Sequence, residues 1–322
     1  MRRLLAGLTV GTFLFATAAC GSSGGSGSSK GASSGGTTTV KVGVIPIVDV
    51  APLYLGQKEG FFGKHGLKLS MTLAQGGAAI VPGVVSGQFQ FGFSNMTSLM
   101  LAESQNVPVR AIANGVASTG VSGKDFGALV VKKGSGLKSA KELEGKKVAV
   151  NTLKNINETA VRASVRKAGG DPDKVKFVEL AFDQMPAALD KGQIDAAMAV
   201  EPALTTMLDQ GAQQIAWPMV DVAKNLTVAM YFTSQAYAAK NPDTVKEFQE
   251  ATAESLAYAD AHPDEVRQIV ATYTKVPAGV LAKVILPKWP ADPNRSSIEA
   301  LEQLSVTDGL FKTAPDLDKL LP

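Results

Sequence analysis

The stretch GQIDAAMAVEP, residues 192–202, repeats the construction of an earlier one, GQFQFGFSNM, residues 87–96. Each stretch opens with Gly-Gln, continues as an apolar run of strand length, and ends on polar residues that begin a helix. A helical pattern also precedes each copy, so each belongs to a strand–helix repeat. Two such copies predict two α/β lobes of related architecture that face each other across a cleft.

Composition limits the kinds of partner. The 322 residues suit about two domains. The net charge of +3 includes Arg2 and Arg3, and would be +1 without them. The remaining basic residues are dispersed, so we expect no nucleic-acid partner. His65 and His262 are far apart in turn-like settings, and no Cys or second His stands at ligand spacing. We therefore expect no metal site and no cofactor.

The N-terminus predicts export and a lipid anchor. Residues 1–19 combine a basic start, a short apolar run and small residues, as signal peptides do. The sequence Thr17-Ala18-Ala19-Cys20 resembles a lipobox, although Leu is usual where Thr17 stands. Residues 20–38 then read as a lipidated Cys20 and a Gly/Ser-rich tether spanning roughly 24 Å. The alternative is an ordinary secreted protein with a free thiol at Cys20, the only cysteine.

After the predicted tether, the chain divides into two lobes. We assign residues 39–126 together with 231–322 to the first lobe, and residues 127–230 to the second. The segment VKVGVIPI, residues 40–47, is continuous and rich in β-branched residues, as buried parallel strands are. The C-terminal helical patterns read as core-facing stripes.

Several strands end at polar residues or glycines that begin a helix, which is where open α/β sheets bind ligands. Such junctions occur at Gly76-Gly77, Ser94-Asn95 and Asn151-Thr152, and at Glu201 before Pro202. The alternative reading is structural. Ser and Asn are ordinary helix caps, and a glutamate at a helix start complements the helix dipole.

The chain resembles the periplasmic substrate-binding proteins of ABC importers in the nitrate/sulfonate/taurine group, which shares its fold with thiamine-pyrimidine precursor proteins. The resemblance covers about residues 40–310. It is carried by APLYLGQKEGFFGKHGLKL (51–69), the glycine pair 76–77, GQFQFGFSN, LEGKKVAVN and GQIDAAMAVEP. It implies the type II periplasmic-binding-protein fold, in which two α/β lobes are joined by two crossing strands and close over a ligand.

The resemblance also implies that the junction residues bind the ligand. These candidates are Asp49, Gly76, Gly77, Ser94, Asn95, Asn114, Asn151, Thr152 and Glu201. Helix-start N–H groups there are suited to an anionic group. None of the junctions carries Arg or Lys, and two of the candidates are acidic. An amino-sulfonate such as taurine, or an aminopyrimidine, suits such a cleft better than nitrate.

We therefore expect a monomeric solute-binding lipoprotein on the outer face of the bacterial cell membrane that delivers a small sulfonate- or taurine-like solute to an ABC permease. The alternatives are a binding protein for an aminopyrimidine or an aromatic carboxylate, and an extracytoplasmic sensor. Pyrimidine synthases of the same fold use His and Cys of their own chain. The predicted folded part has no Cys and no His at a junction, so we expect no enzyme.

Overall fold

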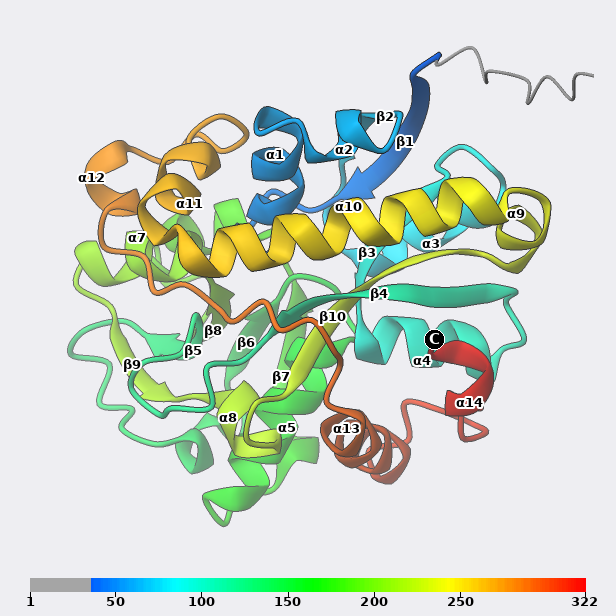
Figure 1. Cartoon of the computed structure of the whole chain (residues 1–322). Helices are drawn as coiled ribbons and strands as arrows, with labels where there is room; N and C mark the ends of the chain where they lie inside the picture. Colours follow the sequence, from blue (N-terminus) through cyan, green and yellow to red (C-terminus); the bar gives the residue numbers. More distant parts are fainter. Residues whose placement is uncertain (1–35) are drawn as a thin grey trace, which may run out of the picture. The chain divides into compact units, whose positions relative to one another are not determined.

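Residues 36–322 are described by a computed structural model, in which two five-stranded sheets are the main feature (Figure 1). The first sheet has the order β2 (Leu67–Leu73), β1 (Thr38–Val44), β3 (Phe91–Asn95), β10 (Thr227–Ser234), β4 (Val109–Ala117). The second has the order β7 (Lys176–Glu179), β6 (Lys147–Val150), β8 (Ala196–Val200), β5 (Gly127–Val131), β9 (Gln213–Ala216). The predicted signal peptide, lipid site at Cys20 and most of the tether lie outside the described residues.

The two sheets have the same topology. In the first, β1 lies parallel between β2 and β3; in the second, β6 lies parallel between β7 and β8. The fourth strand of each sheet, β10 or β5, is antiparallel to both of its neighbours. The two repeated stretches form the central strands β3 and β8. The predicted α/β fold with two lobes of related architecture is therefore confirmed.

The chain passes between the sheets twice, from β4 into β5 and from β9 into β10. Thr227, the first residue of β10, already pairs with Ala117 of β4. The expected boundary at 230/231 therefore falls inside a strand of the first sheet. The second lobe, as the strand pairing defines it, ends before Thr227.

Helices cover both sheets. Those of the second lobe are α5 (Ile156–Lys167), α6 (Met185–Asp190), α7 (Ala203–Asp209) and α8 (Pro218–Val222). Those of the first lobe before β5 are α1 (Ala51–Lys58), α2 (Phe61–Lys64), α3 (Gly77–Val85) and α4 (Met96–Ser104). After β10 come α9 (Gln235–Lys240), α10 (Pro242–Ala261), α11 (Pro263–Val270), α12 (Ala278–Leu281), α13 (Arg295–Thr307) and α14 (Leu317–Leu320).

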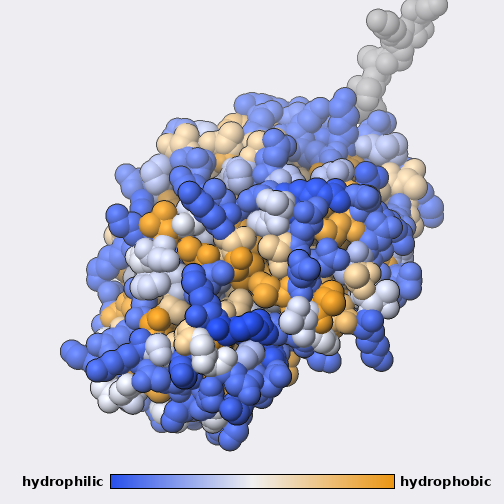
Figure 2. Space-filling view, turned by 90° about the horizontal axis from the view of Figure 1, so that it is seen from below, coloured by the Kyte–Doolittle hydropathy of each residue, from blue (hydrophilic) through white to orange (hydrophobic). Residues whose placement is uncertain are grey.

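The long helix α10, yellow in Figure 1, packs on the first lobe through aromatic side chains. Phe248 of α10 is fully buried and stacks on Phe91 of β3, with ring centroids 3.9 Å apart. Figure 2 shows a largely hydrophilic surface with apolar side chains gathered in the middle of the face seen from below. Within residues 36–322, no helix combines the length and the apolar character needed to cross a membrane.

The lobes touch through the loops that follow β2 and β6. Gln75 and Asn151 exchange hydrogen bonds: the Gln75 side chain donates to the Asn151 carbonyl oxygen (3.0 Å), and the Asn151 side chain donates to the Gln75 carbonyl oxygen (3.3 Å). A Cβ at Gly76 would lie 2.9 Å from Cγ2 of Thr152 and 3.0 Å from Nδ2 of Asn151. Only glycine therefore allows this approach without displacement of the opposite lobe.

A second contact between the lobes involves α13, which lies in the C-terminal segment beyond β10. Thr159 of α5 lies within hydrogen-bond distance of Ser305 of α13, with hydroxyl oxygens 3.4 Å apart. Arg166 of α5 forms an ion pair with Asp308 at the end of α13. Helix α13 therefore contacts the second lobe although its chain segment follows a strand of the first.

Gly76→Ala should disfavour the observed approach of the two lobes. The Gly76 backbone is extended, with φ −171°, so alanine adds steric conflict without backbone strain. Overpacking of this kind costs about 1–3 kcal/mol, and movement of the lobes apart would relieve it. Small-angle X-ray scattering should show a larger radius of gyration than for the wild type.

The matched control is Gly279→Ala in α12, where an added Cβ meets no atom within 4 Å. It should scatter like the wild type. Scattering by Gly76→Ala that is indistinguishable from this control would contradict the interpretation of Gly76 as a lobe contact.

Candidate functional site

A cavity lies between the two lobes, where β1 and β3 of the first sheet face the start of α5 and the end of β8. It encloses about 350 Å³ of empty space, part of which is open to solvent. The enclosed cavity itself has a volume of about 30 Å³, room for only a few water molecules, so a solute enters only when the two lobes move apart. Both lobes contribute to its lining, which consists of Ile45, Ile47, Asp49, Phe93, Asn95, Asn151, Asn155, Ile156, Asn157, Phe182, Val200, Met219, Val228 and Ala229.

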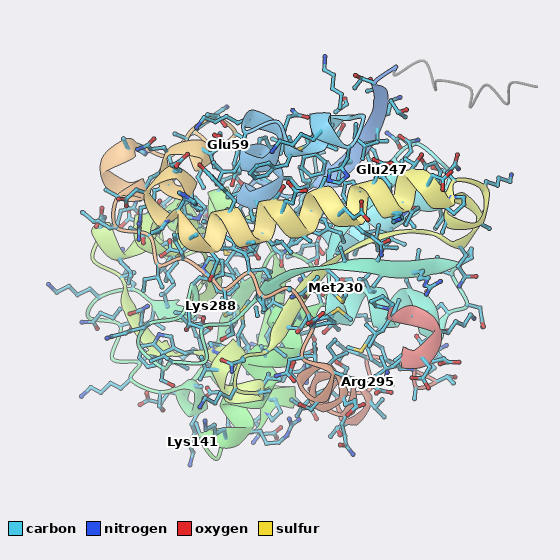
Figure 3. All side chains as sticks on the ribbon, in the orientation of Figure 1. Glu59, Lys141, Met230, Glu247, Lys288 and Arg295 are labelled. Carbon is cyan, nitrogen blue, oxygen red and sulfur yellow. The ribbon has the colours of Figure 1, made fainter. Side chains whose placement is uncertain are left out.

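Three of the residues predicted to bind ligand line this cavity: Asp49, Asn95 and Asn151. The lining therefore combines one aspartate and four asparagines with apolar residues. Figure 3 shows charged side chains such as Lys141 and Arg295 on the outer surface, whereas the labelled Met230 of β10 is buried inside. Of the described residues that line the cavity, none is Arg or Lys.

Asp49 lies in a short 3₁₀ helix, Val48–Val50, between β1 and α1. Its side chain is 3% exposed, and its Oδ1 has no hydrogen-bond partner within the described part of the chain. Burial, with a smaller contribution from the carboxylate of Asp125, raises the pKa of Asp49 to about 7. A buried polar atom without a partner is rare in native proteins and calls for an explanation, such as a ligand or water.

The Asp49 backbone is held firmly, because its carbonyl oxygen accepts a hydrogen bond from Nε1 of Trp289 (3.1 Å). The hydroxyl of Tyr231 is buried without a described partner as well. Burial raises the pKa of Tyr231, and the charge of Asp49 adds to the effect. Tyr231 does not itself line the cavity, so Asp49 is the acidic group that the cavity presents.

Asn95 links the two lobes. Its Oδ1 accepts from the backbone N–H of Ser98 (2.9 Å), which caps α4 as predicted. The same oxygen accepts from the N–H of Ile156 (3.3 Å), the first residue of α5 in the opposite lobe. One side-chain oxygen therefore serves the N-termini of two helices from different lobes.

Asn151 is the centre of an asparagine network that sequence reasoning only partly anticipated. Its Oδ1 accepts from Nδ2 of Asn155 (2.6 Å) and from Nδ2 of Asn157 (2.7 Å). Asn155 also caps α5, where its Oδ1 accepts from the N–H groups of Asn157 and Glu158. The helix begins at Ile156 because Asn155 supplies this cap. Three asparagines within NTLKNIN were the available signal for Asn155 and Asn157.

The glycine pair and its neighbours form close contacts outside the cavity, Gly76 with the opposite lobe and Gly77 within the first lobe. A Cβ at Gly77 would lie 2.0 Å from Oγ of Ser94, so α3 packs directly on the end of β3. The Ser94 hydroxyl donates to the carbonyl oxygen of Asn95 (3.3 Å). Thr152 is buried against Gly76, and its hydroxyl has no described partner. None of these four residues is part of the cavity lining.

Asn114 is placed away from the cavity. Strand β4 continues to Ala117, so Asn114 lies inside the strand and not at its end. Its Nδ2 donates to the carbonyl oxygens of Pro290 (2.7 Å) and Asp292 (3.3 Å). Asn114 therefore fixes the segment that precedes α13.

Glu201 is buried within the protein and already has partners. Pro202 takes the N-cap position, and α7 begins at Ala203. The Glu201 carboxylate accepts from the N–H and hydroxyl of Thr205 (3.0 and 2.7 Å) and from the N–H of Ile285 (3.1 Å). It is fully buried, and the cavity lining does not include it. This is a structural role, which joins α7 to the C-terminal segment.

Neither histidine is near the cavity. His65 is within hydrogen-bond distance of Glu254 on α10 (3.0 Å), and His262 lies beside the Tyr258 carbonyl oxygen (2.7 Å). No cluster of metal-ligating side chains occurs among residues 36–322. The apolar lining includes the aromatic side chains of Phe93 and Phe182.

Glu201→Gln should reduce the pH dependence of stability. Burial raises the pKa of Glu201 from 4.5 to about 7, so the native state holds this proton more tightly than the unfolded state. The resulting stabilisation is present below pH 4.5 and is lost as pH rises through about 7; it amounts to on the order of 3 kcal/mol. Urea unfolding between pH 4 and pH 8 should show a smaller decline for the variant. An unchanged decline would contradict this assignment.

The sequence is similar to proteins that bind or make small molecules. Residues 47–266 match the family model described as NMT1/THI5 like. The chain is 26% identical over 226 residues to the taurine-binding periplasmic protein of Escherichia coli, covering 70% of this chain and 68% of that one. It is 24% identical over 226 residues to 4-amino-5-hydroxymethyl-2-methylpyrimidine phosphate synthase of Aspergillus parasiticus, covering 66% of this chain and 64% of the synthase.

The fold is shared with solved structures. The alkanesulfonate-binding protein of Xanthomonas axonopodis pv. citri, bound to MOPS, superposes with a TM-score of 0.73 at 15% identity, covering 89% of this chain and 99% of that one. This likeness concerns the fold alone. The family model spans more than half of the sequence, from before the cavity residue Asp49 to α11. The chain belongs to the NMT1/THI5-like family.

Proposed function

We propose that this protein is the solute-binding lipoprotein of an ABC importer, and that it captures a small organic solute between its two lobes and delivers it to the permease. The observation that carries the proposal is the cavity, because both lobes line it and each contributes a buried polar atom without a described partner. A solute that contacts both lobes binds the closed arrangement better than an open one, and that difference drives closure.

Two observations support a class of solute: the names of the relatives and the residues that line the cavity. A taurine-like amino-sulfonate is supported by the taurine-binding relative, and an aminopyrimidine by the pyrimidine phosphate synthase. Both carry an amino group that Asp49 can accept from. Nitrate and simple alkanesulfonates lack such a group and are weaker candidates, as are aromatic carboxylates.

We propose a binding role and not a catalytic one, although a synthase is among the relatives. The two histidines are engaged on helices of the outer surface, far along the chain from the asparagine network. A sensor that binds a solute and signals to a membrane receptor would use the same cavity. The importer reading is preferred because relatives named as periplasmic binding proteins match the chain over most of its length.

A panel of solutes should identify a ligand by thermal unfolding of the full mature chain. The panel contains taurine, alkanesulfonates, nitrate, an aromatic carboxylate and an aminopyrimidine. A ligand at 100 times its dissociation constant adds about 2.7 kcal/mol of stability, which raises the unfolding midpoint by several degrees. A chain that no panel member stabilises would contradict the proposed solute classes.

Lipid anchoring at Cys20 is a separate part of the proposal. Cys20→Ala should move the protein from the membrane fraction to the soluble extracytoplasmic fraction, because a signal peptide can still direct export while the acyl chains are absent. Incorporation of labelled palmitate into the wild type, and its loss in the variant, is the direct measurement. A soluble wild-type protein without label would support the alternative of a secreted protein with a free thiol.

A further inference from the structure

The two polar side-chain atoms of the cavity lining that lack a hydrogen-bond partner are oxygens, and this limits what the cavity can bind. Oδ1 of Asp49 from the first lobe and Oδ1 of Asn157 from the second are both buried, and neither has a hydrogen-bond partner within residues 36–322. Because buried polar atoms are nearly always paired, both oxygens are expected to accept hydrogen bonds from a molecule in the cavity.

The orientation of the Asn157 amide follows from its neighbours. Nδ2 of Asn151 donates to the Gln75 carbonyl oxygen, so the other end of that amide, Oδ1, is an acceptor. Asn157 must then present its NH₂ group to Asn151, at 2.7 Å. Its oxygen is consequently the end left without a partner, on a residue that lines the cavity.

The backbone donors at the start of α5 are already engaged within the protein. The first three N–H groups of α5, those of Ile156, Asn157 and Glu158, donate to the side-chain oxygens of Asn95 and Asn155. These are the groups with which a helix N-terminus would bind an anion. The described lining also lacks Arg and Lys. An anionic group placed here would meet the Asp49 carboxylate without compensation.

We infer that the cavity recognises a nitrogen group carrying two or more N–H bonds and positive charge, such as a primary ammonium, an amidinium or a protonated aminoheterocycle. This inference rests on the proposed solute-binding function. Asp49 accepts one N–H and supplies the counter-charge, while Asn157 accepts another from the opposite lobe. Apolar residues of the lining, including Phe93 and Phe182, contact the carbon skeleton once the lobes have moved apart to admit the ligand. The ligand thus joins the lobes through its nitrogen.

The inference is tested with matched pairs of probes on the full mature chain carrying Cys20→Ala. The pairs are taurine with ethanesulfonate, and 4-amino-5-hydroxymethyl-2-methylpyrimidine with 5-hydroxymethyl-2-methylpyrimidine. Isothermal titration calorimetry should give an affinity about 10- to 100-fold higher for the amine-bearing member of at least one pair, as expected for hydrogen bonds to a charged group. Asp49→Asn should bring that ratio toward one, and Asn157→Ala should lower it to a smaller extent.

The matched control is Glu103→Gln. Glu103 is a buried carboxylate on α4 that accepts from the N–H of Asp316 and does not line the cavity. It should leave the affinity ratio unchanged. The ratio of two affinities reports recognition of the amine and is insensitive to a general loss of stability. The wild-type ratio alone also tests the inference should a variant not fold.

Two results would overturn the inference. One is the lack of a preference for the amine in both pairs, with ethanesulfonate and the des-amino pyrimidine each bound by the wild type as tightly as its amine-bearing partner or more tightly. The other is a preference for the amine that survives Asp49→Asn. In both cases a solute still binds, so the proposed function would stand while the inference fails. A protein that binds none of the four probes would count against the proposed function as well.

Discussion

The side-chain amide of Asn151 is the interaction on which the arrangement of the two lobes depends. Its NH₂ group donates across the lobe boundary to Gln75, and its oxygen accepts from both Asn155 and Asn157 at the start of α5. A planar amide has a donor end and an acceptor end in fixed positions. The contact between the lobes and the orientation of the residues at the cavity are therefore set by the same group.

The asparagine network also determines which partners the N–H groups at the start of α5 have. In open α/β sheets, strand ends deliver helix N-termini whose free N–H groups favour anions. Here Asn95 and Asn155 occupy the first N–H groups of α5, and Asn95 does so from the opposite lobe. The N–H of Ile156 thus contributes to the contact between the lobes, and those of Asn157 and Glu158 are capped within the second lobe. The polarity of the cavity is consequently decided by side-chain oxygens, although the backbone frame is that of relatives named for binding taurine or alkanesulfonates.

The sequence predicted the fold well because the decisive patterns are local and repeated. Gly-Gln followed by an apolar run occurs at residues 87 and 192, and both copies form the central strand of a sheet. The cap at Asn95 was equally local. The partners of the site residues were beyond reach, because they lie far along the chain: Ile285 donates to Glu201, and Pro290 accepts from Asn114. A strand end gives a residue's place in the sheet, but not the direction of its side chain.

Two buried carboxylates illustrate that limit. Asp49 and Glu201 both stand where a strand gives way to a helix, both lie near the passage between the lobes, and burial raises the pKa of each to about 7. They are close in the structure, because the N–H of Val48 donates to the Glu201 carbonyl oxygen (3.1 Å). Glu201 accepts three hydrogen bonds from its own protein, and a carboxylate so engaged has little left to offer a ligand. Asp49 keeps an unpartnered oxygen at the cavity wall. Burial and acidity are common to both, so the supply of donors around each group is what separates a structural carboxylate from one that can receive a solute.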